Sequence, residues 1–280
     1  MPTFDTRAPI SAVVALIMGE VRISAGDRAT TIVAVNPSDA DDAEDVQAAQ
    51  LTRVEYGEGR LLVKAPRPRS WHGRKGGSVD VAIELPAGSD LIGHAASGDF
   101  QGDGRLGDCR IKLGLGQVQL DEVATLSVKS GAGDVSVRRV TLRAEVATGT
   151  GDIRVEELGD GAEIKNSNGD TWVGTAHGDL RVRSANGSLA VGTALGGVSA
   201  KSANGDIRLG DVAGGSVAVE THAGDLEVGI RAGTAAWLDL NAGAGRVHNG
   251  LEAAERPESE ADTVEVRART AIGDIVVQRA

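Results

Sequence analysis

The 280-residue chain contains a single cysteine, and only 2% of its residues are aromatic. The lone Cys109 excludes an intramolecular disulfide framework, as expected in a reducing compartment. One tyrosine, two phenylalanines and three tryptophans are too few for an extended sugar-stacking or base-stacking surface. The core must therefore be filled mainly by Val, Ile, Leu and Ala.

Basic charge and long apolar runs are also scarce. The chain has 29 Lys and Arg against 40 Asp and Glu, which gives a formal net charge of −11. This balance disfavours general attraction to phosphate backbones or anionic lipid, so no nucleic-acid partner is expected. No stretch approaches the roughly 20 apolar residues of a membrane span, so no integral membrane segment is expected either.

Residues 10–18 form an apolar stretch within the length range of a secretory signal core. Its flanks do not fit a signal, because Asp5 precedes it and Arg7 is the only cation before it. Alternation of apolar and polar residues continues through Val21 and Ile23. The pattern indicates a strand and hairpin rather than a cleaved signal. A cytoplasmic location is therefore expected, with export by a route lacking a recognisable signal as the alternative.

Glycine, by contrast, is in excess. The 39 glycines in 280 residues are about 14% of the chain, twice the ordinary share of roughly 7%. Many begin a Gly-Asp-apolar-x-apolar unit, and successive units are 18, 17, 18, 18, 18, 18, 19, 21 and 28 residues apart. Such a period is typical of repeat architectures. The glycines that define it are Gly98, Gly116, Gly133, Gly151, Gly169, Gly187, Gly205, Gly224, Gly245 and Gly273.

Each repeat contains two short strand patterns. Apolar residues stand two and four positions after the glycine, as Val135 and Val137 do, and a second pair follows nine residues later at Ala144 and Val146. This alternation predicts two strands, each with one buried face. About five inward aliphatic residues give about 10 kcal/mol per coil, whereas fixing each backbone residue costs roughly 1 to 2 kcal/mol. One coil therefore cannot fold alone, and the coils must stack.

The sequence thus predicts an all-β fold, a parallel β-helix or solenoid of about 18-residue coils. Stacking in register would place Val146, Ile164 and Val182 one above the next. Successive Asn-Gly corners, with Asn168, Asn186 and Asn204, predict a ladder of stacked amides.

The two ends of the chain depart from the period. Residues 1–92 show strand patterns with a short acidic helix near residues 38–50, which predicts an N-terminal β-sheet cap. The solenoid is predicted over residues 93–280, with an acidic, proline-containing loop inserted near residues 251–262. Uncovered ladder ends let copies add to one another, so self-association through the solenoid ends is a further expectation.

The GDI and GDV coils, the Ser-Ala-Asn-Gly corners of residues 184–187 and 202–205, and the terminal RTAIGDIVV closely resemble bacterial putative-adhesin domains of unknown function, especially their actinobacterial members. The resemblance covers nearly the whole chain. It implies a β-solenoid fold and brings no catalytic residues with it.

An aspartate follows the glycine in most repeats and forms one column. Calcium-binding β-rolls neutralise stacked carboxylates with metal, but their aspartate follows glycine by two positions. Capping of turn backbone by the carboxylates is the favoured interpretation, with a calcium-dependent β-roll as an alternative. No metal and no cofactor are therefore expected. The column consists of Asp99, Asp134, Asp152, Asp170, Asp206, Asp225 and Asp274.

A partial basic column is predicted to offset the aspartates, with an anion site as the alternative. It contains Lys129, Lys165, Arg183 and Lys201. The five histidines occupy unrelated positions, so neither catalysis nor zinc binding is expected, and the chain is predicted not to be an enzyme. A carbohydrate-active β-helix enzyme remains an alternative on architecture alone.

Residues 66–77, PRPRSWHGRKGG, form a locally basic loop in an acidic protein. An exposed Trp flanked by cations is typical of contacts to a protein or anionic partner, although a solvated loop explains the composition too. The leading hypothesis is a non-catalytic scaffold or protein-interaction module with an unknown protein partner. The candidate contact residues are Arg67, Arg69, Trp71, Arg74, Lys75 and, on an outward strand position, Trp172.

Overall fold

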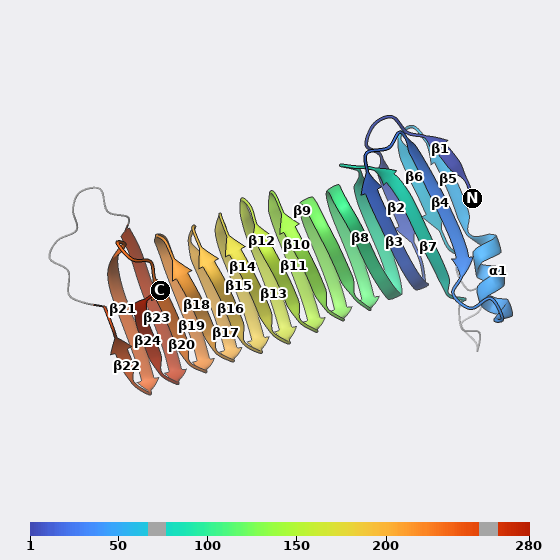
Figure 1. The fold of residues 1–280 in the computed structure, drawn as a ribbon. Helices are drawn as coiled ribbons and strands as arrows, with labels where there is room; N and C mark the ends of the chain where they lie inside the picture. The colour runs from blue at the N-terminus through green and yellow to red at the C-terminus, as the bar shows by residue number, and fades with distance from the viewer. Residues whose placement is uncertain (67–76, 252–262) are drawn as a thin grey trace. The chain divides into compact units, whose positions relative to one another are not determined.

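A computed structural model describes residues 1–66, 77–251 and 263–280. The chain divides into two compact units, Met1–Val140 and Thr141–Ala280. Both contain parallel strands stacked coil upon coil, which confirms the predicted parallel β-solenoid (Figure 1). No helix of the described residues has the length and apolar character needed to cross a membrane.

The second unit shows the repeat in its most regular form. Each coil contributes one strand to each of two faces, and each strand pairs in parallel with its counterpart in the next coil. Val146 lies beside Ile164, and Ile164 lies beside Val182, as the repeat predicts. One face consists of β11 (Arg143–Thr150), β13 (Gly161–Asn168), β15 (Asp179–Asn186), β17 (Val198–Asn204) and β19 (Gly215–Ala223). The other consists of β12 (Ile153–Leu158), β14 (Thr171–Ala176), β16 (Leu189–Ala194), β18 (Ile207–Val212) and β20 (Leu226–Ile230).

Glycine is required at the corner between the two faces. Gly169 has a φ of +128°, a backbone conformation that side chains with a Cβ rarely adopt. A Cβ at this position would also lie 2.2 Å from the carbonyl oxygen of Gly151 in the preceding coil. The high glycine content therefore follows from close stacking, since the neighbouring backbone fills the space that a side chain would need.

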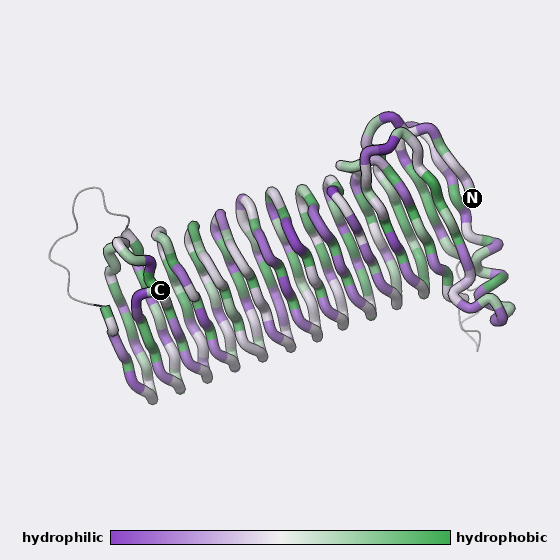
Figure 2. The backbone as a smooth tube through the Cα atoms, viewed as in Figure 1, coloured by the Kyte–Doolittle hydropathy of each residue, from purple (hydrophilic) through white to green (hydrophobic). Residues whose placement is uncertain are grey.

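The inward positions of both faces form the apolar core. Ile153, Val155 and Ile164 are at most 1% exposed. Hydrophobic and hydrophilic residues alternate along the strands (Figure 2). Phe100, in the first unit, is a fully buried ring, and it lies where a Cβ on Gly93 would come within 2.5 Å of it. The Phe100 ring thus fills space that a side chain at position 93 would need, in line with an interior that has little room for aromatic residues.

The last coil in the sequence is not the last coil in space. Strands β23 (Thr263–Ile272) and β24 (Ile275–Arg279) pair with β19 and β20. On their other side they pair with β21 (Ala235–Ala244) and β22 (Val247–Asn249). The C-terminal coil is therefore inserted between two earlier coils. The 28-residue step to Gly273 is therefore not one more coil added in chain order after an inserted loop, and this is possible because every coil offers a similar apolar layer and corner to a neighbour.

The first unit inserts an early coil in the same way. Strand β2 (Ser11–Ala15) lies between β6 (Arg60–Lys64) and β8 (Asp90–Leu115), paired in parallel with both. Strand β3 (Met18–Gly26) lies likewise between β7 (Val79–Pro86) and β8. The strands predicted in this region are present. The hairpin is wrong, because β2 and β3 are successive strands of one coil that turns at Gly19, where φ is +130°.

Antiparallel strands and a helix complete the first unit. Strand β4 (Thr30–Pro37) pairs with β7 and with β1 (Thr3–Asp5), and β5 (Arg53–Gly57) pairs with β6. Helix α1 (Ala43–Leu51) lies near the predicted acidic segment, and the Asp42 carboxylate caps it by accepting from the Glu44 N–H at 2.7 Å. The coils continue through β8, β9 (Val118–Ala132) and β10 (Val135–Val140). The domain boundary at residue 92 stays a prediction.

Candidate functional site

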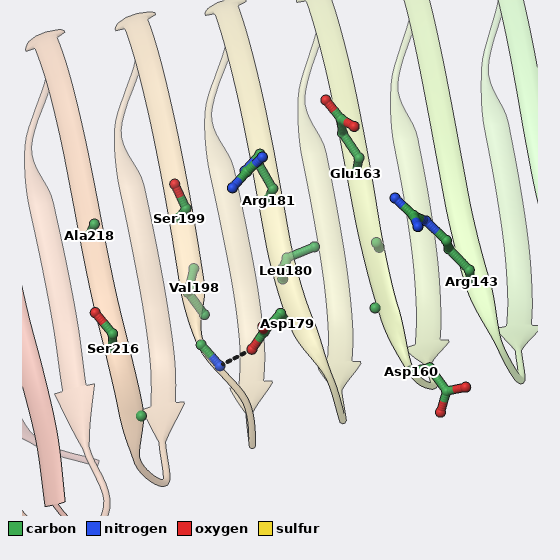
Figure 3. Close-up of a pocket in the computed structure, with 14 residues that line it drawn as sticks. Arg143, Asp160, Glu163, Asp179, Leu180, Arg181, Val198, Ser199, Ser216 and Ala218 are labelled. Atoms are coloured by element: carbon green, nitrogen blue, oxygen red, sulfur yellow. Dashed lines mark hydrogen bonds between the residues drawn. The ribbon is translucent and has the colours of Figure 1, made fainter.

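A groove of about 770 Å³ lies on the β11, β13, β15, β17 and β19 face of the second unit (Figure 3). Its lining combines small residues with charged ones. The small residues are Gly161, Ala162, Gly197, Ser199, Gly215, Ser216 and Ala218. The charged residues are Arg143, Asp160, Glu163, Asp179 and Arg181.

Strand register creates the hollow. Arg181 lies beside Ser199, and Ser199 lies beside Ala218, so one outward row passes from a long side chain to two short ones. These three residues come from three successive coils. Because the backbone is continuous beneath them, missing side-chain volume leaves an open groove rather than an internal cavity.

The Glu163 carboxylate is held at the rim of this groove. Lys165 Nζ lies 2.9 Å from Glu163 Oε1. The hydrogen bond and charge of Lys165 lower the pKa of Glu163, and the nearby Arg183 and Arg181 charges act in the same direction. Glu163 therefore stays ionised near neutral pH, which does not suit it to act as a general acid.

Asp179 is engaged by the backbone. Its Oδ1 accepts a hydrogen bond from the Gly197 N–H of the next coil at 3.0 Å (Figure 3). This bond ties the start of β15 to the residue that precedes β17, at one end of the groove. Asp160 lies at the same end, where its backbone N–H donates to the Leu142 carbonyl at 3.1 Å.

Three arginines on this face, unlike Glu163 and Asp179, have no bonded partner in the described part of the chain. Within the described residues, Arg143, Arg181 and Arg183 make neither an ion pair within 4 Å nor a side-chain hydrogen bond. Arg143 and Arg181 project over the face in Figure 3. Their donors are therefore available to an anionic group that enters the groove, and a guanidinium can hold a carboxylate through two parallel hydrogen bonds.

The basic column predicted from the sequence borders this groove. Lys165, Arg183 and Lys201 lie side by side on β13, β15 and β17. Lys165 pairs with Glu163, and Lys201 Nζ lies 2.6 Å from a carboxylate oxygen of Glu220, whose pKa it lowers. These two lysines therefore pair directly with glutamates on their own face, and that they also offset the charge of the aspartate column stays a prediction.

The aspartates instead bind backbone. Asp152 Oδ1 accepts from the Asp170 N–H at 2.8 Å, and Asp170 Oδ1 accepts from the Ser188 N–H at 2.8 Å. The carboxylates bind backbone N–H groups, as predicted, but each donor belongs to the next coil rather than to the turn of the aspartate itself. In the part of the chain that the structure describes, no three His, Cys, Asp or Glu side chains gather as a metal-binding cluster.

Trp172, the predicted contact residue that the structure describes, does not line the groove. Trp172 lies on β14, on the other face, and is half-buried. The guanidinium carbon of Arg154 lies 3.9 Å from the Trp172 ring centroid, so a cation already covers the indole. The remaining five candidates lie outside the described residues: Arg67, Arg69, Trp71, Arg74 and Lys75.

Comparison with known proteins gives likeness in fold only. No family model and no curated protein matches the chain. Similar solved structures include a "putative cell adhesion protein" from Clostridium sporogenes, with 11% identity, 100% and 98% of the two chains covered, and a TM-score of 0.22. A "putative adhesin" from Parabacteroides distasonis has 12% identity, 98% and 95% coverage, and a TM-score of 0.33. A "putative lipid binding protein" from the same organism has 11% identity, 99% and 95% coverage, and a TM-score of 0.37.

Proposed function

We propose that this chain is a non-catalytic protein-interaction module that binds an extended acidic segment of a partner protein in the groove. The observation that carries the proposal is the row of small residues, Ser199 and Ala218, beside Arg181 and near Arg143, two guanidinium groups without an ion-pair partner in the described residues. The small residues admit a chain, and the arginines select its charge.

The state of the groove carboxylates supports a binding role over catalysis. A glycosidase needs a carboxylic acid with a raised pKa beside a second carboxylate. Here the pKa of Glu163 is lowered by Lys165, and Asp179 is bonded to the Gly197 N–H. A polysaccharide-cleaving enzyme is therefore not favoured. A calcium-dependent β-roll is not favoured either, because Asp152 and Asp170 are bonded to backbone N–H groups.

An adhesin-like role is one setting for such a module. It is the role suggested by the resemblance of the Gly-Asp coils, and a surface that captures an extended partner segment is what adhesion needs. The TM-scores of the solved structures are too low to argue for it. The cytoplasmic location and the absence of catalysis remain predictions.

Binding of fluorescein-labelled oligo-glutamate and oligo-lysine peptides of equal length, followed by fluorescence anisotropy, tests the proposal. Oligo-glutamate should bind, and raising the salt concentration should weaken binding because the contacts are ionic. Arg181→Glu should reduce affinity at least tenfold. Ser199→Trp, which fills the groove without changing charge, should do the same.

Arg208→Glu is the matched control, since Arg208 lies on β18 of the other face and pairs with Glu227 at 3.4 Å. It makes the same charge change away from the groove and should leave binding unchanged. Equal loss in Arg208→Glu and Arg181→Glu would show that only net charge matters. No binding of oligo-glutamate, or binding that survives Ser199→Trp, would reject the groove as the site.

A further inference from the structure

The coil formed by β21 and β22 lies at a spatial end of the second unit. Within the described residues, β21 pairs only with β23, and β22 pairs only with β24. The other side of both strands therefore carries backbone N–H and C=O groups that no described strand satisfies. Such an edge is a template for the addition of another strand.

The apolar layer of this coil is open as well. In the two coils stacked on the paired side of β21 and β22, the inward residues, such as Val217 of β19 and Val266 of β23, are fully buried. Leu238 and Leu240 occupy the equivalent inward positions of β21 but are only half-buried, and Val247 of β22 is 46% exposed. One side of a core layer is thus presented to solvent.

The edge has few of the features, such as proline and inward-pointing charges, that prevent exposed strands from pairing with another chain. The segment from residue 235 to 249 contains no proline and only two charged residues other than histidine. Asp239 lies 3.4 Å from the Arg269 guanidinium of the next strand, and Arg246 lies 3.9 Å from Asp274. Both charged side chains are thus turned towards the coil of β23 and β24. Neither is an inward-pointing charge that would prevent another strand from adding to this edge.

We propose that this end packs against the same end of a second copy of the chain about a two-fold axis, with β21 antiparallel to its counterpart. A matching surface must offer two strands about 10 Å apart with an apolar layer between them. Strands β23 and β24 already meet that requirement on one side of β21 and β22, so the coil accepts a neighbour of its own kind.

A second copy meets the requirement by symmetry, because a two-fold interface joins one patch to itself. The outer coil of the first unit, β6 and β7, does not, since β5 and β4 already pair with its strands. The coil end measures roughly 30 Å by 20 Å, so about 1,200 Å² would be buried in total, at the lower limit for a specific interface. The expected dimer is therefore weak, with a Kd in the micromolar range.

Sedimentation velocity of the full chain up to about 1 mM tests the proposal, with a concentration-dependent shift from monomer to dimer as the expected result. Leu240→Lys and Val247→Lys place a charge in the open layer and should weaken the dimer at least tenfold. Leu142→Lys is the control, because Leu142 lies elsewhere in the same unit and is exposed to the same extent as Val247, 46%.

Circular dichroism melts show whether each variant folds. A monomer at every concentration would overturn the proposal, and so would a dimer that persists in both Leu240→Lys and Val247→Lys. Larger assemblies that grow with concentration would also overturn it, since a two-fold contact closes at two copies. The test is independent of the groove, and either proposal can fail without the other.

Discussion

The side-chain amide of Asn186 donates from Nδ2 to Oδ1 of Asn168, one coil away, at 2.8 Å. Its own Oδ1 accepts from Asn204 Nδ2 of the following coil at 2.9 Å. The three amides form the ladder that the spacing of the Asn-Gly corners predicts. Asn186 is the middle member and takes part in two bonds, whereas Asn204 takes part in one of them.

Replacing the middle amide should therefore cost more than replacing the outer one. Asn186→Ala is expected to lower the free energy of unfolding by about 1 to 2 kcal/mol and Asn204→Ala by about half as much. Both changes remove an asparagine from the same type of turn, so the difference isolates the ladder. Urea unfolding followed by circular dichroism measures it, and equal losses would argue that the ladder bonds contribute nothing.

The corner glycines should tolerate no side chain. Gly169→Ala combines a φ of +128° with a Cβ placed 2.2 Å from the Gly151 carbonyl oxygen, so a loss of about 3 kcal/mol or more is expected. Gly57→Ala is the control, because a Cβ at Gly57 meets nothing within 4 Å. Thermal melts should show a clear drop in Tm for the first variant alone.

The repeat could be predicted because inward residues such as Val146, Ile164 and Val182 recur every 18 positions and have to stack. The order of the last coils could not. A step of 28 residues between Gly245 and Gly273 fits a coil with a loop in chain order as well as an inserted coil, since all coils offer similar apolar layers.

The groove could not be predicted from the sequence for a related reason. Its shape depends on which outward residues become neighbours, and Arg181, Ser199 and Ala218 are 18 and 19 positions apart. The small size of Ser199 and Ala218 indicates no groove until the register places them beside Arg181. The one detectable clue was the basic column, which borders the groove without lining it.

An inner corner of the second unit offers a stabilising change. Thr221 Oγ1 donates to the Gly205 carbonyl of the preceding coil at 3.0 Å. Ser202 occupies the same position one coil earlier, but its buried hydroxyl has no partner among the described residues. Ser202→Thr should therefore add about 1 kcal/mol, because the β-branched side chain restricts its hydroxyl to the orientation seen at Thr221.

Ser202→Ala provides the matched control. Removing a hydroxyl that makes no bond should change stability by less than about 0.5 kcal/mol. A loss of more than about 1 kcal/mol in chemical denaturation would mean that the hydroxyl is satisfied, and the basis for the threonine prediction would be lost.

Cys109 should make stability fall at alkaline pH. Burial, together with the charges of Asp90 and Asp108, raises the pKa of the thiol from an ordinary 9.0 to about 12. Because the folded chain holds the proton more tightly, the contribution is complete below pH 9 and is lost as pH rises towards 12. Between pH 8 and 10.5 the loss amounts to about 2 kcal/mol.

Cys109→Ala removes this contribution while leaving the other titrating groups in place. Its free energy of unfolding should therefore fall about 2 kcal/mol less than that of the unaltered chain over the same pH interval. Urea denaturation at the two pH values gives both slopes, and identical slopes would contradict the assignment to this thiol.

The insertion of β23 and β24 between earlier strands determines where the solenoid could lengthen during evolution. A duplicated 18-residue segment among β11 to β20 would slide into register with both neighbours, because adjacent coils there are also adjacent in the chain. A duplicate of β23 and β24 is not adjacent in the chain to a gap between their two neighbours, and the site that remains for it is the open side of β21 and β22. Tandem duplication would thus lengthen the middle of this unit directly, whereas a copy of the C-terminal coil would have to add at the end formed by β21 and β22.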